Sequence, residues 1–83
     1  HKGGDLAMAV KAYVLIETQV GKTKQVAEAI RKVQGAASVD VVTGPYDAIA
    51  IIQAETLSDI GDLITAKVHP VAGISRTVTC IAV

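Results

Sequence analysis

The sequence contains few aromatic side chains and carries no net charge. The first feature limits what the core can be built from, and the second argues against nucleic-acid binding. Its 83 residues include no Phe or Trp and only two Tyr, although 51% are hydrophobic. The core must therefore be built from small aliphatic side chains, which bury less surface each than aromatic ones. Eight basic residues balance eight acidic ones. Because nucleic-acid binding needs an excess of positive charge along one surface, we expect no direct contact with nucleic acid.

Cysteine and long apolar runs are also scarce. Cys80 is the only cysteine, so no disulfide can form within the chain, and a reducing, cytoplasmic location is expected. Its place in the middle of an apolar segment predicts a buried, unreactive thiol. No apolar run approaches the roughly 18 residues of a membrane span. We expect no membrane contact.

The length accommodates one domain. Residues 1–7 have no periodicity and precede Met8, and we interpret them as the remnant of an expression tag, which leaves residues 8–83 as the domain. A domain of this size buries only about 60% of the surface that its unfolded chain exposes. It therefore gains stability from association with another chain.

Four segments have the composition of β-strands, because β-branched and other apolar residues dominate them and turn residues separate them. They are residues 9–20, 37–43, 47–55 and 74–83. The first and third segments are apolar at successive positions, so both faces of each strand are apolar.

Two segments have the three- and four-residue apolar spacing of amphipathic helices. The spacing is carried by Val26, Ala29, Ile30 and Val33 in the first segment and by Leu57, Ile60, Leu63, Ile64 and Val68 in the second. Thr23 and Thr56 are the expected N-caps, the latter with Asp59 three residues later as in a capping box. His69-Pro70 is expected to end the second helix.

The resulting order, strand-helix-strand-strand-helix-strand, predicts an α+β, ferredoxin-like fold with a four-stranded antiparallel sheet. Right-handed crossovers place both helices on the same face of such a sheet. An antiparallel sheet with one wet face alternates between apolar and polar residues, and the first and third strands do not. A second copy of the chain is the expected cover for the remaining face, which gives a dimeric α+β barrel.

Residues for catalysis are not arranged in any recognisable pattern. Ser58, His69 and Asp47 could make a triad in principle, but their spacing does not support one. The isolated His69 is interpreted as a helix-end residue, and Glu17 and Glu55 as solvated strand ends rather than an acid–base pair. We expect no catalytic residues, no metal ligands and no cofactor, and hence no enzyme.

The most informative segment is Thr43-Gly44-Pro45-Tyr46-Asp47, between the second and third strands. Gly44 permits a close approach to the backbone, and Asp47 offers a carboxylate that could bind the ammonium group of an amino acid. Three hydroxyls line one face of the last strand, those of Ser75, Thr77 and Thr79. In the alternative interpretation, Asp47 caps the turn and the hydroxyls pack within the sheet.

From Ala12 to Val83 the chain resembles the ligand-sensing domain of the leucine-responsive/asparagine-operon regulators, the Lrp/AsnC family. Three segments carry the resemblance. They are Val20-Gly21, Thr43-Gly44-Pro45-Tyr46-Asp47 and Gly73-Ile74-Ser75-Arg76-Thr77-Val78-Thr79.

The resemblance implies a homodimeric barrel that assembles into a higher oligomer, with an amino acid or similar small effector bound between subunits. Carried over to this sequence, Gly44, Tyr46 and Asp47 are the expected effector contacts, with Thr77 and Thr79 as further ones. Family members carry a helix-turn-helix domain ahead of this one, and no segment here matches it. The chain is then either a natural stand-alone sensor or a domain cut from a longer protein, and Met8 just before the first strand favours the stand-alone form. We expect such a sensor to regulate transcription or metabolism through a partner, such as a full-length family regulator.

Two other functions fit the same fold, because fold does not determine function. One is a small cofactor-free enzyme on a dimeric barrel, of the monooxygenase or isomerase type. The other is a purely structural oligomerisation unit.

Overall fold

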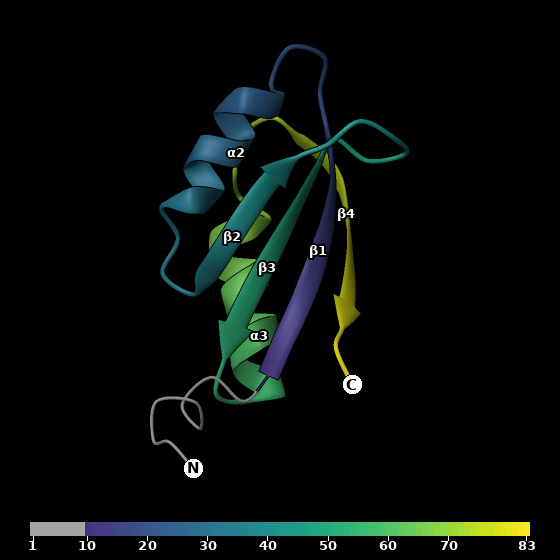
Figure 1. Cartoon of the computed structure of the whole chain (residues 1–83). Helices are drawn as coiled ribbons and strands as arrows, with labels where there is room; N and C mark the ends of the chain where they lie inside the picture. The colour runs from purple at the N-terminus through teal and green to yellow at the C-terminus, as the bar shows by residue number, and fades with distance from the viewer. Residues whose placement is uncertain (1–9) are drawn as a thin grey trace.

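The computed structural model describes residues 10–83 as a four-stranded antiparallel sheet with its helices on one side (Figure 1). The spatial order of the strands is β2-β3-β1-β4. Their bounds are Val10–Thr18 for β1, Ala36–Val41 for β2, Ala48–Ala54 for β3 and Ile74–Ile81 for β4. The interpretation of residues 1–7 as a tag lies outside the described residues.

Two helical segments make the crossovers. Helix α2 (Thr23–Arg31) joins β1 to β2, and α3 (Leu57–Leu63) continues into a π-helical turn, η1 (Ile64–Val68), before β4. The predicted βαββαβ order and ferredoxin-like fold are confirmed. No helix within residues 10–83 has both the length and the apolar character needed to cross a membrane.

The core lies between the helices and one face of the sheet. Every second residue of the two central strands is fully buried there, because side chains alternate along a strand. These residues are Ala12, Val14 and Ile16 of β1 and Ala48, Ala50 and Ile52 of β3. The helices add Val26 and Ile30 from α2, Ile60 from α3 and Val68 from η1. Each fully buried Val or Ile contributes about 1.5–3 kcal/mol of transfer free energy.

The opposite face of the sheet faces the viewer in Figure 1. Its part on β3, β1 and β4 is apolar, and no helix or strand of the described chain packs on it, whereas β2 continues it with the polar Ser38 and Asp40. Two rows of paired residues cross β3, β1 and β4 on this face. One row is Ile49–Leu15–Val78 and the other is Ile51–Tyr13–Cys80. The prediction that β1 and β3 are apolar on both faces is therefore confirmed. We call these six residues the open sheet face.

Two local predictions were wrong. Thr23 is not an N-cap, because α2 begins after Lys22 and no side chain caps it. The thiol of Cys80 is exposed rather than buried, because its strand has an apolar face that nothing within residues 10–83 covers.

The predicted ends of the second helix are confirmed. The hydroxyl of Thr56 accepts a hydrogen bond from the amide of Asp59 at 3.0 Å, as an N-cap should. The helical segment ends at Val68, directly before His69-Pro70.

Candidate functional site

The loop between β2 and β3 is attached to β1 through Asp47. The amide of Asp47 donates to the carbonyl of Ile16 at 2.8 Å. In return the amide of Thr18 donates to Oδ2 of the Asp47 carboxylate, also at 2.8 Å. Asp47 therefore joins the β2–β3 loop to β1, and the hydrogen bond of its carboxylate goes to Thr18 rather than to its own turn. Within residues 10–83 this carboxylate is engaged only through Oδ2, so Oδ1 is open to a ligand.

The end of β1 is also connected to helix α2. The hydroxyls of Thr18 and Thr23 lie 2.6 Å apart and share a hydrogen bond. The chain of contacts runs from Asp47 through Thr18 to the first turn of α2. Sequence reasoning missed this connection, because Thr18 lies 29 residues from Asp47 and nothing in its neighbourhood indicates the pairing.

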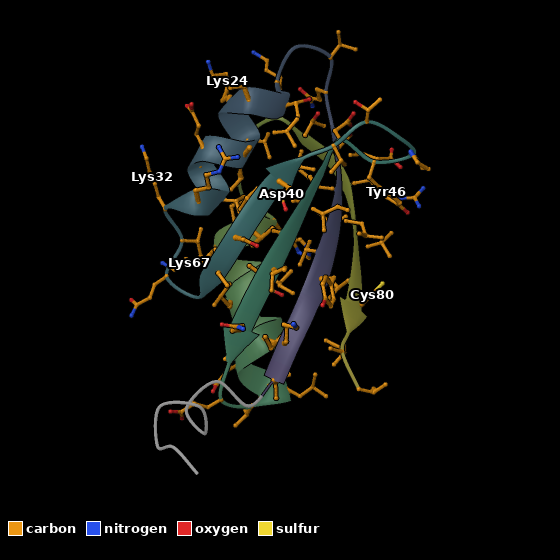
Figure 2. All side chains as sticks on the ribbon, viewed as in Figure 1. Lys24, Lys32, Asp40, Tyr46, Lys67 and Cys80 are labelled. Atoms are coloured by element: carbon orange, nitrogen blue, oxygen red, sulfur yellow. The ribbon has the colours of Figure 1, made fainter. Side chains whose placement is uncertain are left out.

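Gly44 and Tyr46 lie in the same loop as Asp47. A Cβ added to Gly44 would meet no atom within 4 Å, so there is open space beside this backbone. Tyr46 is half-buried, and Figure 2 shows its side chain beside the loop rather than over the middle of the sheet. The structure thus brings Gly44, Tyr46 and Asp47 together on one loop.

Thr77 and Thr79 lie apart from that loop, on edge strand β4. They pair with Ile16 and Val14 of β1, so their side chains are on the helical side of the sheet. Since β1 lies between β3 and β4, and neighbouring strands are about 4.8 Å apart, Thr77 is on the order of 10 Å from Asp47. The hydroxyl of Thr77 instead lies 3.3 Å from Nε2 of His69. One small molecule on a single chain cannot easily reach Asp47 and Thr79 together.

The chemistry of this loop suits recognition of a small polar ligand. A carboxylate oxygen, a phenol and exposed backbone around Gly44 can bind an ammonium group and a carboxylate. Among residues 10–83 no cluster of His, Cys, Asp or Glu could hold a metal ion, and the described part of a single chain forms no enclosed pocket. The loop is therefore an open surface, with polar groups next to the end of β1.

The sequence of this domain matches the family model described as the Lrp/AsnC ligand binding domain, over residues 11–83. The match includes the loop, the open sheet face and both helices. The chain belongs to the Lrp/AsnC ligand-binding family.

Named relatives of this Lrp/AsnC domain are regulators of transcription. An uncharacterized HTH-type transcriptional regulator of Pyrococcus furiosus is 31% identical over 80 residues, which are 93% of this chain and 53% of that protein. The chain thus spans about half the length of the curated relatives it matches.

Solved structures show the same fold. The protein TTHA0845 of Thermus thermophilus is 31% identical, with a TM-score of 0.84, over 89% of this chain and 92% of that one. The transcriptional regulator NMB0573 of Neisseria meningitidis, solved in complex with L-methionine, has a TM-score of 0.84. It is only 10% identical, over 100% of this chain and 55% of that one, so this second likeness shows the fold alone.

Proposed function

We propose that this Lrp/AsnC domain binds a small amino-acid effector at the β2–β3 loop, in a site that a second copy of the chain completes. The observation that carries the proposal is the Asp47 carboxylate. Its Oδ2 is fixed by the Thr18 amide, and its Oδ1 is free to accept a hydrogen bond from the ammonium group of a ligand. Gly44 and Tyr46 would contact the rest of the ligand, and Thr77 and Thr79 of a neighbouring copy are further candidate contacts.

Two features support a site between copies rather than within one. The loop of a single chain is an open surface, whereas small-molecule sites bury most of their ligand. The open sheet face lies beside the loop and needs a cover, since exposed apolar patches of this kind mark interaction sites. A regulator solved with L-methionine shares the fold, which makes free amino acids the first ligands to test.

The domain would then act on transcription indirectly. Its acidic and basic residues balance, so it lacks the excess charge that binds DNA backbones. We propose that effector binding changes its association with a partner that carries a DNA-binding domain, such as a full-length regulator of the same family.

The effector proposal is tested by thermal unfolding of the domain in the presence of each common L-amino acid. An effector present at about 100 times its dissociation constant adds about 2.7 kcal/mol to the free energy of unfolding. We expect one amino acid or a small related group to raise the melting temperature, and the others to have no effect.

Two variants at Asp47 separate ligand binding from loop structure. Asp47→Asn keeps an oxygen that can accept from the Thr18 amide but removes the negative charge, so we expect a normal fold and a lost ligand response. Asp47→Ala removes both and should also lower the stability of the free protein. The assignment is wrong if Asp47→Asn responds to the ligand as strongly as the original protein.

A further inference from the structure

Three polar atoms of Asp47 are held by hydrogen bonds within the chain. Its amide donates to the carbonyl of Ile16 at 2.8 Å, and its carbonyl accepts from the amide of Val42 at 2.9 Å. These two bonds fix the main chain of Asp47 but leave its side chain free to rotate. The third bond, from the amide of Thr18 to Oδ2 at 2.8 Å, fixes the carboxylate. The direction in which Oδ1 points therefore depends on where the Thr18 amide lies.

The end of β1, where Thr18 lies, is supported by helix α2. Thr18 is the last residue of β1, and the register between β1 and β4 shifts between Glu17 and Thr18, so the ladder is irregular there. The half-buried hydroxyls of Thr18 and Thr23 lie 2.6 Å apart. Figure 1 shows the end of β1, the start of α2 and the β2–β3 loop at the same end of the sheet. The hydroxyl pair thus holds the strand end at the point where the ladder is irregular.

The hydroxyl of Thr23 is bonded to this strand end and not to its own helix. Within residues 10–83 no side chain caps helix α2, although threonine is a good helix cap. The turn before α2 brings the two threonines together. In it the amide of Lys22 donates to the carbonyl of Gln19 at 3.0 Å, and Gly21 has φ of +79°, which glycine adopts at little cost.

We propose that Thr23 is a positioning residue for the effector site, which acts through Thr18 rather than by touching the effector. Its hydroxyl holds Thr18, and the amide of Thr18 holds the Asp47 carboxylate with Oδ1 open to an ammonium group. A group that is already oriented binds more tightly, because it loses less conformational freedom on binding. This role of Thr23 rests on the proposed function, and it adds to the site a residue of α2, outside the β2–β3 loop.

Two substitutions at Thr23 test this role. Thr23→Val removes the hydroxyl and keeps the shape of the side chain, whereas Thr23→Ser keeps the hydroxyl. The probe is the L-amino acid that most raises the melting temperature of the original protein, and isothermal titration calorimetry measures its affinity. Thr23→Val should bind it about three- to tenfold more weakly, as expected for the loss of one hydrogen bond. Thr23→Ser should bind it like the original protein.

The matched control is Thr65→Val. It makes the same chemical change at an exposed threonine of η1, and it should leave the affinity for the probe unchanged. An equal loss of affinity in Thr65→Val and Thr23→Val would overturn the assigned role, because the effect would then not depend on the bond to Thr18.

Thr18→Val tests whether the two hydroxyls act as one bond. It removes the second hydroxyl of the pair but keeps the amide that donates to Asp47. We expect Thr18→Val to weaken binding of the probe as much as Thr23→Val, and the double variant to be no weaker than either single variant. Effects that add in the double variant would overturn the assigned role, because the two hydroxyls would then act independently.

Hydrogen exchange of the free protein tests the positioning without any amino acid present. The Thr18 amide should exchange about three- to tenfold faster in Thr23→Val than in the original protein, and at the original rate in Thr23→Ser. The amide of Val14, in the middle of β1, should change less. Equal acceleration at Thr18 and Val14 would indicate a general loss of stability and overturn the assigned role.

The two sets of measurements separate this role from the proposed function. If the original protein binds an amino acid and Thr23→Val binds it equally well, or if the Thr18 amide exchanges at the original rate in Thr23→Val, the role of Thr23 is overturned and the proposed function stands. If no L-amino acid binds the original protein, the proposed function is wrong, and the role of Thr23 falls with it.

Discussion

Two glycines of the fold differ in whether the structure leaves room for a side chain at their position. Gly35, in the turn before β2, has φ of +104°, and a Cβ added there would lie 2.5 Å from Cδ1 of Leu63 and 3.3 Å from the carbonyl oxygen of Gln53. Gly61 lies within α3, and a Cβ added there would meet no atom within 4 Å. Gly35 is thus required by both its backbone conformation and the approach of α3, whereas Gly61 only costs backbone entropy.

This contrast predicts opposite signs for two alanine substitutions. Gly61→Ala should raise the free energy of unfolding by about 0.5–1 kcal/mol, because alanine favours the helix. Gly35→Ala should lower it by about 1–3 kcal/mol, because the left-handed backbone and the contact with Leu63 both become unfavourable. Urea unfolding at one protein concentration measures both, and a stabilising Gly35→Ala would contradict the structure.

The structural roles of single residues could be predicted from the sequence where those roles depend on residues nearby in the chain. The role of Thr56 was predictable because its N-cap partner, Asp59, is three residues away. The hydrogen bond from Thr18 to Asp47 was not, since it depends on β1 and the β2–β3 loop meeting in space. Thr23 was misread for the same reason: its hydroxyl bonds Thr18 rather than its own helix. Whether Asp47 binds an effector stays a prediction.

At the scale of elements, the second helical segment, α3 continued by η1, is defined by local signals at both ends. Thr56 caps its first turn, an apolar stripe faces the core through Ile60 and Ile64, and Pro70 stops the helix soon after Val68. The order and type of all six predicted segments are correct because each has such signals. The predicted strand ends differ from the observed ones by one or two residues at most positions. The π-helical turn η1 was not predicted, because apolar spacing alone does not distinguish it from an α-helix.

Removing the cap should weaken α3 specifically. Thr56→Ala should lower the free energy of unfolding by about 1 kcal/mol, since the amide of Asp59 loses its acceptor. Thr56→Ser keeps a hydroxyl at the same place and should stay within a few tenths of a kcal/mol of the original protein. Chemical denaturation compares the two, and equal losses in both variants would show that the methyl group, not the hydroxyl, matters.

At the scale of the whole molecule, the main feature is the open sheet face. The helices use one face of the sheet, and the other presents Leu15, Ile49, Ile51 and Val78 without any cover in the described chain. Because the chain has only 83 residues, it has little apolar surface besides this face that it could bury to gain stability. The sequence could show that both faces of β1 and β3 are apolar, but not the geometry of the copy that covers them.

A charge placed in the middle of this face should separate the copies. Ile51→Lys puts an unpaired ammonium group into the proposed contact, and the dissociation constant of the dimer should rise by at least about tenfold. Val41→Lys is the matched control, because Val41 is also an aliphatic strand residue, 54% exposed, but lies on the helical side at edge strand β2. Sedimentation velocity distinguishes them, and equal effects of the two substitutions would argue against this interface.

The most direct measurement is the mass of the unmodified protein by sedimentation equilibrium at low micromolar concentration in about 1 M NaCl, where charge-driven contacts are screened. Apolar association survives salt, so the mass should be twice that of the chain. A mass equal to one chain under these conditions would contradict the account, because Leu15 and Ile51 would then be in contact with water and no site between copies could form at the β2–β3 loop.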